Sequence, residues 1–329
     1  MVDVSVIIAA YNESRFISKC LDSLIRQNFD SFEIVVVDDG SKDGTSEVVK
    51  TYISCYPGRV RLIRLRKNLG AGNARNIGAF YARGRVIAFL DADMEFPPTF
   101  LSSLVRPILE ESEMATCTSI EIIANTDNPW VMVQGQRLRG SFRQERTGFV
   151  RAIRRDLFLK SGGYDAKFGY FDDQSLHRKT GITSAVVKDA SLYHHNPDTA
   201  GEVLWRNFWM GRSILRTHKL LDVAVMAARR LVDLSPPAAL VLLFTGVPLL
   251  QVFGAILLAA FVFAVVRHRV LEHNVFVGRL VVRLFYVPAY RFLRAAGFIG
   301  GLLYWVVAGD WARIGTTDQL DKLVIEFSG

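Results

Sequence analysis

Three of the acidic pairs in this 329-residue sequence have surroundings that suggest chemistry, and one of them could bind a metal ion. Asp91-Ala92-Asp93 places two carboxylates at positions i and i+2, where they can share a divalent cation and leave coordination positions for phosphate oxygens. Oxygen ligands of this kind select Mg²⁺ or Mn²⁺, and Glu95 could add another. Because such triplets are common on loops, the spacing alone does not establish a metal site.

A second pair, Asp38-Asp39, could bind a nucleoside. A carboxylate accepts hydrogen bonds from a nucleobase edge or from ribose hydroxyls. The alternative is a strand-to-helix turn, in which Gly40 allows a positive φ and Asp43 or Thr45 caps the next helix. The two roles are compatible, and we expect Asp38 and Asp43 to be structural and Asp39 to face a ligand.

The third pair, Asp172-Asp173, could supply a general base. It follows Gly162-Gly163-Tyr164-Asp165 and is flanked by aromatic residues. Burial and the neighbouring carboxylate would set the pKa of such a base. The alternative is an ordinary acidic helix N-terminus.

The segment from Asn68 to Gly78 is rich in small residues, which let a backbone approach a ligand closely. Within it Arg75 could reach a base or a pyrophosphate as a cation. Neither the Walker pattern nor Gly-x-Gly-x-x-Gly fits this segment.

Apolar runs alternate with helical patterns over the first 100 residues, which predicts an α/β fold with a mostly parallel, Rossmann-like sheet and helices on both faces. In such sheets ligands bind beyond the carboxyl ends of the strands, where both Asp38-Asp39 and Asp91-Ala92-Asp93 stand. We expect strands at 4–8, 32–37, 60–65 and 86–90, helices at 14–26, 45–56 and 74–82, and further strands near 115–123, 148–154 and 183–188.

Taken in order with Ala9-Ala10-Tyr11-Asn12-Glu13, these segments resemble family 2 glycosyltransferases over residues 3–200. The resemblance implies the GT-A fold, a nucleoside-diphosphate sugar donor, a divalent metal and an inverting displacement. Ala9 stands where the family commonly has proline, and Asp172 replaces the usual Glu of a Glu-Asp pair. The Gln-x-x-Arg-Trp signature of processive synthases is missing, which favours transfer of a single sugar.

The resemblance also implies roles for individual residues. Asp39 would bind the base, Asp91 would contact ribose or metal, and Asp93 would hold the metal against the diphosphate. Asp173 would deprotonate the acceptor hydroxyl, and His194 or His195 would approach the metal or diphosphate. The expected nucleotide-sugar site is Ala9, Tyr11, Glu13, Asp39, Arg75, Asp91 and Ala92; the expected metal ligands are Asp93, Asp91, Glu95 and His195; Arg206 and Arg212 are candidate diphosphate contacts.

The C-terminal part has the composition of membrane helices. No charged residue occurs from Leu234 to Val266, a run of 33 positions, and about 20 apolar residues suffice to cross a bilayer. A buried core helix is the alternative. Residues 201–329 hold 14 of the 40 basic residues but 8 of the 32 acidic ones, a bias that suits anionic lipid headgroups. We expect a catalytic domain at 1–200, juxtamembrane amphipathic helices at 201–236, membrane-embedded helices at 237–309 and a soluble tail at 310–329.

The sequence allows two topologies for the apolar segment in the membrane. A single crossing at 238–266 would put the following arginines, Arg267 among them, outside the cytosol, against the positive-inside tendency. A re-entrant hairpin broken at Pro248 would keep them cytosolic. A second apolar stretch covers 295–309. We expect the protein at the cell membrane with its catalytic domain in the cytoplasm, where the three scattered cysteines would be reduced.

These features predict an inverting glycosyltransferase that moves one sugar from a nucleoside-diphosphate sugar to polyprenyl phosphate or a lipid-linked glycan. One alternative is a catalytically silent membrane protein that binds nucleotide sugars or scaffolds a pathway. Another is a nucleotidyltransferase, although its usual Gly-x-Gly-Thr-Arg loop is absent from the N-terminal region. The net charge of +8 does not indicate nucleic-acid binding, because no arginine-rich helix or zinc-finger spacing accompanies it.

Overall fold

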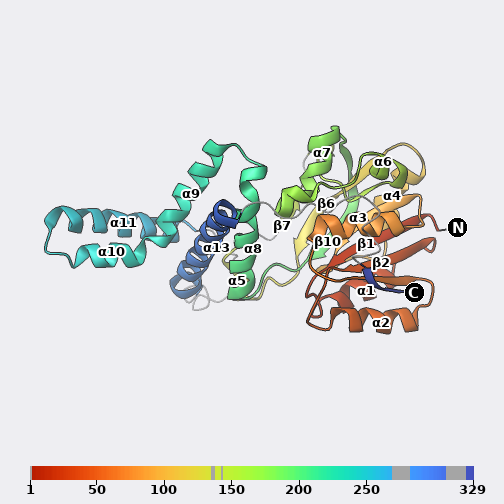
Figure 1. The fold of residues 1–329 in the computed structure, drawn as a ribbon, viewed down its shortest axis with the longest axis horizontal. Helices are drawn as coiled ribbons and strands as arrows, with labels where there is room; N and C mark the ends of the chain where they lie inside the picture. Colours follow the sequence, from red (N-terminus) through yellow and green to blue (C-terminus); the bar gives the residue numbers. More distant parts are fainter. Residues whose placement is uncertain (1, 135–137, 142–143, 269–281, 309–323) are drawn as a thin grey trace. The chain divides into compact units, whose positions relative to one another are not determined.

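The computed structural model describes residues 2–134, 138–141, 144–268, 282–308 and 324–329 (Figure 1). The chain forms two compact units. The first comprises Met1–Ile122, Leu138–His194 and Ala312–Gly329, and the second comprises Ile123–Arg137 and His195–Trp311.

The first unit is built on a mixed sheet in the order β11-β3-β2-β1-β4-β9-β6-β10-β5, with β7 beside β6 and β8 beside β10. The first four strands run parallel, and the strand pairs beyond β4 and β3 run antiparallel. The strands are β1 Val4–Ala10, β2 Phe32–Asp38, β3 Val60–Leu65, β4 Val86–Asp91, β5 Met94–Glu95, β6 Ala115–Ile123, β7 Leu138–Ser141, β8 Arg146–Thr147, β9 Ala152–Arg154, β10 Ser184–His194 and β11 Val324–Ser328.

Helices cover both faces of this sheet because successive strand residues point to opposite sides and both sides are apolar. On one face Val6 and Ile8 pack with α1, α2 and α4. On the other face Ile7 and Phe89 pack with α3 and α6. These helices are α1 Ile17–Ile25, α2 Thr45–Cys55, α3 Ala71–Tyr81, α4 Phe100–Leu109 and α6 Arg155–Lys160; the 3₁₀ segment η1 Ala166–Gln174 and α7 Ser175–Thr180 follow.

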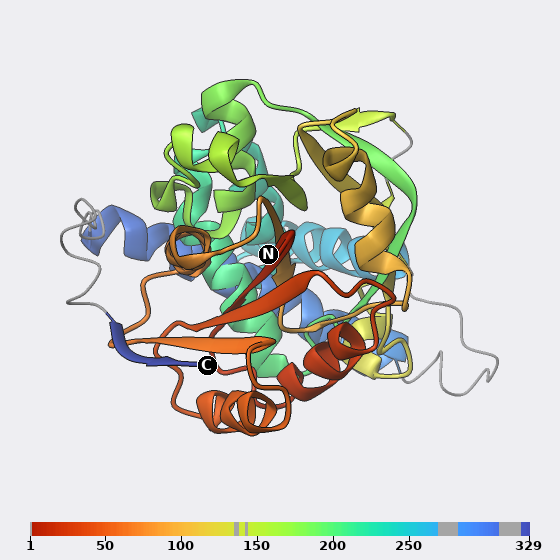
Figure 2. The same ribbon diagram turned by 90° about the vertical axis from the view of Figure 1, so that its right-hand side faces the viewer.

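The predicted α/β fold is confirmed, and most element bounds differ only at their ends. The strand expected at 115–123 is β6 itself, whereas the one expected at 148–154 is reduced to β9. The strand expected at 183–188 is the start of the longer β10, which continues to His194. At the other edge β11, drawn in blue in Figure 2, lies along β3, so the final residues complete the sheet.

The second unit consists of helices: α5 Pro129–Met132, α8 Ala200–Ser213, η2 Ile214–Arg216, α9 Leu220–Leu234, α10 Pro236–Leu243, α11 Pro248–Val266, the π-helical η3 Val282–Tyr286 and α13 Val287–Ala308. Of the two paths left open for residues 238–266, the structure has the one that is broken before Pro248, since α10 and α11 are separate helices. Pro248 lacks an N–H and restricts Val247 to an extended conformation, so α11 starts anew at Pro248. The two helices pack side by side as a hairpin (Figure 1).

Among the described residues one helix, Pro248–Val266, is long and apolar enough to cross a membrane, with a mean hydropathy of 2.7. Its side chains are largely exposed in this structure. The second apolar stretch forms the C-terminal part of α13. Most of the tail expected at 310–329, namely residues 310–323, lies outside the described residues.

Candidate active site

The carboxyl ends of three parallel strands bring two acidic segments together. β1 lies between β2 and β4, with Ala10 opposite Asp38 and Ala9 opposite Asp91. Asp38 and Asp91 therefore end strands on either side of the same central strand. The sheet thus juxtaposes segments separated by more than 50 positions in the sequence.

Asp38 and Asp39 are both buried but bind different groups. Asp38 accepts hydrogen bonds from the Ser41 N–H at 2.8 Å and from the Ser46 hydroxyl, which fixes the turn after β2. Asp39 accepts from the N–H groups of Leu69 at 2.7 Å and Gly70 at 2.8 Å. Burial raises the pKa of Asp39 to about 7, although these two hydrogen bonds oppose the shift. The Asp39 carboxylate thus anchors the loop that precedes α3.

The segment after β1 is tied to the turn after β2. Asn12 adopts φ +58° and its side-chain oxygen accepts the Lys42 N–H at 2.9 Å. The Glu13 N–H donates to the Thr45 hydroxyl oxygen at 2.9 Å. Tyr11 is exposed beside this double turn. The arrangement presents an aromatic ring and a carboxylate at the same strand ends as Asp39.

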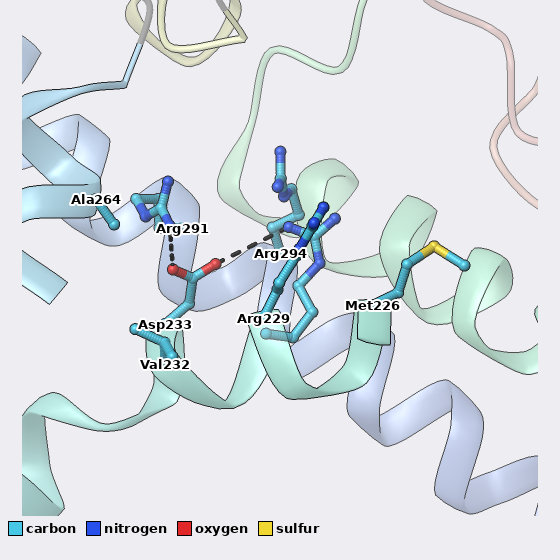
Figure 3. A pocket seen from close by; sticks show the side chains of 8 residues that line it. Met226, Arg229, Val232, Asp233, Ala264, Arg291 and Arg294 are labelled. Atoms are coloured by element: carbon cyan, nitrogen blue, oxygen red, sulfur yellow. Dashed lines mark hydrogen bonds and ion pairs between the residues drawn. The ribbon is translucent and has the colours of Figure 1, made fainter. Parts of the chain in front are cut away.

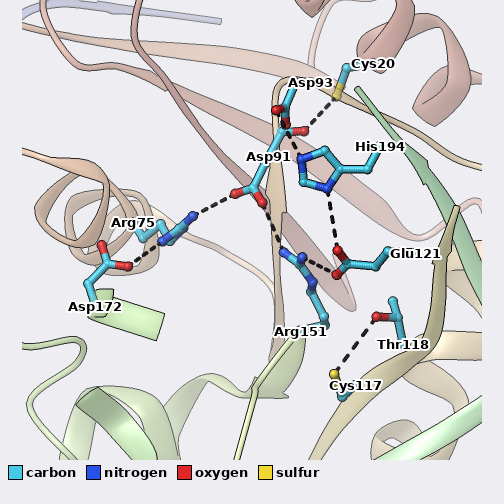
Figure 4. A network of polar contacts seen from close by, with 10 residues as sticks. All are labelled: Cys20, Arg75, Asp91, Asp93, Cys117, Thr118, Glu121, Arg151, Asp172 and His194. Carbon is cyan, nitrogen blue, oxygen red and sulfur yellow. Dashed lines mark hydrogen bonds and ion pairs between the residues drawn. The ribbon is translucent and has the colours of Figure 1, made fainter. Parts of the chain in front are cut away.

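Asp91 lies between two partly buried guanidinium groups (Figure 4). Arg75 on α3 donates to Asp91 at 2.7 Å and to Asp172 at 3.0 Å, and Arg151 donates to the second oxygen of Asp91 at 3.3 Å. Burial alone would raise the pKa of Asp91, but Arg75 and Arg151 outweigh it and hold that pKa well below its usual range. Both oxygens of Asp91 are therefore occupied by arginines, which leaves Asp93 as the carboxylate of the triplet that faces other partners.

Asp93 contacts His194 at the end of β10 (Figure 4). The distance from His194 Nε2 to Asp93 Oδ2 is 3.1 Å, and the other ring nitrogen lies 3.5 Å from Glu121. Glu121 in turn accepts from Arg151 at 2.6 Å. His194, one of the two histidines expected near the metal or diphosphate, lies beside Asp93, because β10 pairs with β5 and sets His194 opposite Met94.

Asp172 and Asp173 lie on η1 against the start of α3. A Cβ atom on Gly72 would lie 2.7 Å from an Asp172 oxygen, so only glycine fits there. Asn76 holds the preceding loop, since it accepts the Tyr164 N–H and donates to the Tyr164 carbonyl, both at 2.8 Å. Burial and then the Asp172 charge raise the pKa of Asp173 to about 6. A carboxyl group with that pKa is suited to accept a proton near neutral pH.

The remaining predicted residues have less defined roles. Ala9 lies within β1 and Ala92 is buried directly after β4. Glu95 lies in β5 opposite Tyr193. His195, Arg206 and Arg212 belong to the second unit, where Arg212 lies over the rings of Trp209 and Tyr304.

Sequence reasoning missed Arg151 and Glu121, which complete the network around Asp91 and His194. A signal for Glu121 was present, because a carboxylate interrupts the apolar strand at 115–123 and a buried charge requires a partner. Arg151 carried no comparable signal. It reaches the site because β9 pairs with β4, a pairing that no local pattern reveals.

Comparison with known proteins identifies the same regions. The model of the glycosyl transferase family 2 matches residues 5–173. The uncharacterized glycosyltransferase YibD of Escherichia coli is 37% identical over 208 residues, which cover 63% of this chain and 56% of that protein. The succinoglycan biosynthesis protein ExoO of Rhizobium meliloti is 42% identical over 105 residues, 32% of this chain and 29% of that protein. The chain thus spans little more than half of the length of YibD and under a third of the length of ExoO.

Two solved structures share the fold. Staphylococcus aureus TarS aligns with 79% of this chain and 43% of its own, at a TM-score of 0.50 and 19% identity. The mannosyltransferase PcManGT from Pyrobaculum calidifontis, solved with GDP-Man and Mn²⁺, aligns with 93% of this chain and 88% of its own, at a TM-score of 0.50 and 18% identity. These likenesses support the expected GT-A architecture.

Proposed function

Because the chain belongs to glycosyl transferase family 2, we propose that it transfers one sugar from a nucleoside-diphosphate sugar to a membrane-associated acceptor, with inversion at the anomeric carbon. One observation carries the proposal. The base-binding candidate Asp39, the triplet from Asp91 to Asp93 and the pair Asp172-Asp173 all meet the N-terminal half of α3 or its bonded partners. Three separate acidic motifs thereby lie around the start of α3, near the carboxyl ends of the parallel strands.

The residues at Asp93 fit a divalent cation. A carboxylate oxygen and an imidazole nitrogen face each other at 3.1 Å, and Glu121 holds the far side of the ring as partner carboxylates do for metal-bound histidines. Among the described residues no group of three or more His, Cys, Asp or Glu side chains is arranged so that all of them could hold a metal ion. Asp93 and His194 are the two side chains that would hold the cation, and phosphate oxygens of the donor would be its natural further ligands. The nitrogen ligand favours Mn²⁺ over Mg²⁺.

In this proposal the residues of the site have different roles in the reaction. Asp39 and Tyr11 hold the nucleoside, and Asp91 with its two arginines keeps the edge of β4 rigid. When bound, the cation neutralises the charge that develops on the diphosphate as its bond to the sugar breaks. Asp173 accepts the proton of an attacking hydroxyl. A phosphate acceptor is already anionic and needs little help from this base.

The apolar hairpin α10–α11 supports an acceptor that lies in the bilayer, either polyprenyl phosphate or a lipid-linked glycan. It also supports location at the cell membrane, with the catalytic unit on the cytoplasmic side. The basic bias of residues 201–329 agrees with contact to anionic headgroups.

A donor screen tests the proposal. The purified chain in detergent is incubated with uridine- and guanosine-diphosphate sugars, a polyprenyl phosphate and Mn²⁺ or Mg²⁺, and sugar transfer to lipid is measured. We expect transfer with at least one donor, loss of transfer in chelator, and a loss of about 10²-fold or more in Asp93→Ala. Undiminished turnover in chelator would rule out the metal. Donor binding without transfer or hydrolysis across the screen would favour a catalytically silent protein.

A further inference from the structure

The second unit contains a cavity lined mainly by arginines. It has a volume of about 360 Å³ and lies among helices α9, α11 and α13 (Figure 3). Volumes of roughly 300–1,000 Å³ are usual for small-molecule sites. Its lining residues are Met226, Arg229, Arg230, Val232, Asp233, Ala264, Arg291 and Arg294. We call this cavity the arginine pocket.

The charges in the arginine pocket are not balanced by its own residues. Asp233 is the one carboxylate among the eight lining residues, and four of them are arginines. Asp233 is buried and accepts from Arg291 at 2.5 Å, while Arg230 lies 3.9 Å from its second oxygen. Arg229 and Arg294 have no carboxylate among the lining residues left to them. An excess of three positive charges therefore faces the cavity.

Buried guanidinium nitrogens point to the same deficit. Within the described part of the chain, the Nε atoms of Arg291 and Arg294 are buried without a hydrogen-bond acceptor. The Arg294 guanidinium lies 5.6 Å from the ring centre of Tyr290, which helps to orient it towards the cavity wall. Buried donors are nearly always paired in proteins, so an anionic acceptor is the expected complement.

The part of the cavity wall that α11 contributes indicates the source of this anion. Ala264 belongs to the last turns of the apolar helix Pro248–Val266, on which Phe253, Ile256 and Phe263 are exposed. Clustered arginines at the end of an exposed apolar helix place a charged group at the depth of lipid headgroups.

We propose that the arginine pocket binds the phosphate headgroup of a lipid whose chains lie along the hairpin α10–α11. Forked guanidinium groups match the geometry of phosphate oxygens. The headgroup can come from a polyprenyl phosphate or from an anionic phospholipid of the bilayer. Binding of polyprenyl phosphate rests on the proposed function, in which that lipid is the acceptor. The preference of the pocket for a phosphate group does not depend on the proposed function.

Binding is measured on the full-length chain in detergent by native mass spectrometry, without sugar donor. The probes are undecaprenyl phosphate, undecaprenol, phosphatidylglycerol and inorganic phosphate. We expect undecaprenyl phosphate to bind at least 10-fold more tightly than undecaprenol, and the double variant Arg229→Gln/Arg294→Gln to lose about 10-fold or more of that affinity. These two arginines have no carboxylate partner among the lining residues, so their replacement leaves the Asp233–Arg291 pair intact.

The control Lys219→Gln removes one positive charge from an exposed position at the start of α9, outside the pocket. It should leave the affinity unchanged. Equal binding of phosphatidylglycerol and undecaprenyl phosphate supports the headgroup site with a bulk lipid as its source, and selective binding of undecaprenyl phosphate supports the acceptor. Three results would overturn the proposal. Undecaprenol could bind as tightly as undecaprenyl phosphate, or inorganic phosphate could compete fully at the same affinity. The double variant could also bind undecaprenyl phosphate as tightly as the wild type. Because no donor is present, absence of sugar transfer cannot produce any of these results.

Discussion

Asp91 and Asp93 are two positions apart yet occupy different electrostatic surroundings. Asp91 is neutralised by Arg75 and Arg151, and Asp93 faces His194. Removal of one partner from a buried ion pair leaves an unpaired charge, at a cost of roughly 3–5 kcal/mol. Under the proposed function, Asp91 would keep the site rigid and Asp93 would bind the metal.

Substitution of Asp173 distinguishes an alcohol acceptor from a phosphate acceptor. Burial raises its pKa to about 6, so the fraction able to accept a proton increases as pH rises through 6. With an alcohol acceptor we expect the rate to rise over pH 5–7, and Asp173→Asn to lower it about 10²–10⁴-fold. The measurement is initial rate against pH for both proteins.

With a polyprenyl phosphate acceptor the same variant should keep most of its rate. A rate with an alcohol acceptor that is near normal in Asp173→Asn would show that another group is the base.

Asp39 makes stability depend on pH. Its pKa is about 7 in the folded chain against an unfolded value near 4, so the folded state binds the extra proton between these limits. Its contribution to stability is therefore present below pH 4 and lost as pH rises towards 7, by up to about 4 kcal/mol. In Asp39→Asn this part of the pH dependence should vanish.

The check is urea unfolding of both proteins in detergent at pH 4 to 8, with the wild-type value subtracted from that of the variant. A difference that stays constant with pH would contradict the buried, proton-binding state of Asp39.

At the scale of elements, the start of α3 joins the parts of the site. Its N-terminal loop binds Asp39, Gly72 touches Asp172, and Arg75 bridges Asp172 to Asp91. A displacement of this helix would therefore move all three acidic segments relative to one another.

Gly72→Ala tests this role. The added Cβ would lie 2.7 Å from the Asp172 carboxylate and force α3 from η1. We expect a loss of about 1–3 kcal/mol of stability and a fall in turnover on the order of 10²-fold. Thermal unfolding and initial rates measure the two effects.

Gly201→Ala on α8 is the matched control, since no atom lies within 4 Å of its added Cβ. It should leave turnover unchanged. If Gly72→Ala turns over sugar as fast as this control, α3 does not position the site.

At the scale of the whole molecule, the hairpin α10–α11 is the part of the chain that we propose attaches it to the membrane. Phe244 and Leu249 flank its turn and are 87% and 78% exposed. A bilayer would cover such side chains, and each aspartate placed there would oppose insertion by up to about 3 kcal/mol.

We expect Phe244→Asp/Leu249→Asp to shift much of the protein from the membrane to the soluble fraction, measured by vesicle flotation. Met114→Asp, at an exposed apolar residue of the first unit, should float like the wild type. Equal flotation of the wild type and both variants would show that the hairpin does not attach the protein to the membrane.

The sequence by itself determined the elements of the first 100 residues and the place of the acidic motifs at strand ends. Apolar runs, helical spacing and turn residues are local patterns, so they suffice to place Asp38-Asp39 and Asp91-Ala92-Asp93 at the carboxyl ends of strands. The break at Pro248 was likewise readable as one of two possible paths, because proline removes a hydrogen bond wherever it stands.

Only the tertiary structure decided which side chains meet. Arg151 reaches Asp91 through the pairing of β9 with β4, His194 reaches Asp93 through β10 and β5, and Arg291 reaches Asp233 across 58 positions. Strand order and helix packing bring these distant residues within hydrogen-bonding distance of one another, and they are set by burial of the whole core. A local pattern cannot specify them, because the partner's position is not written near the residue that needs it.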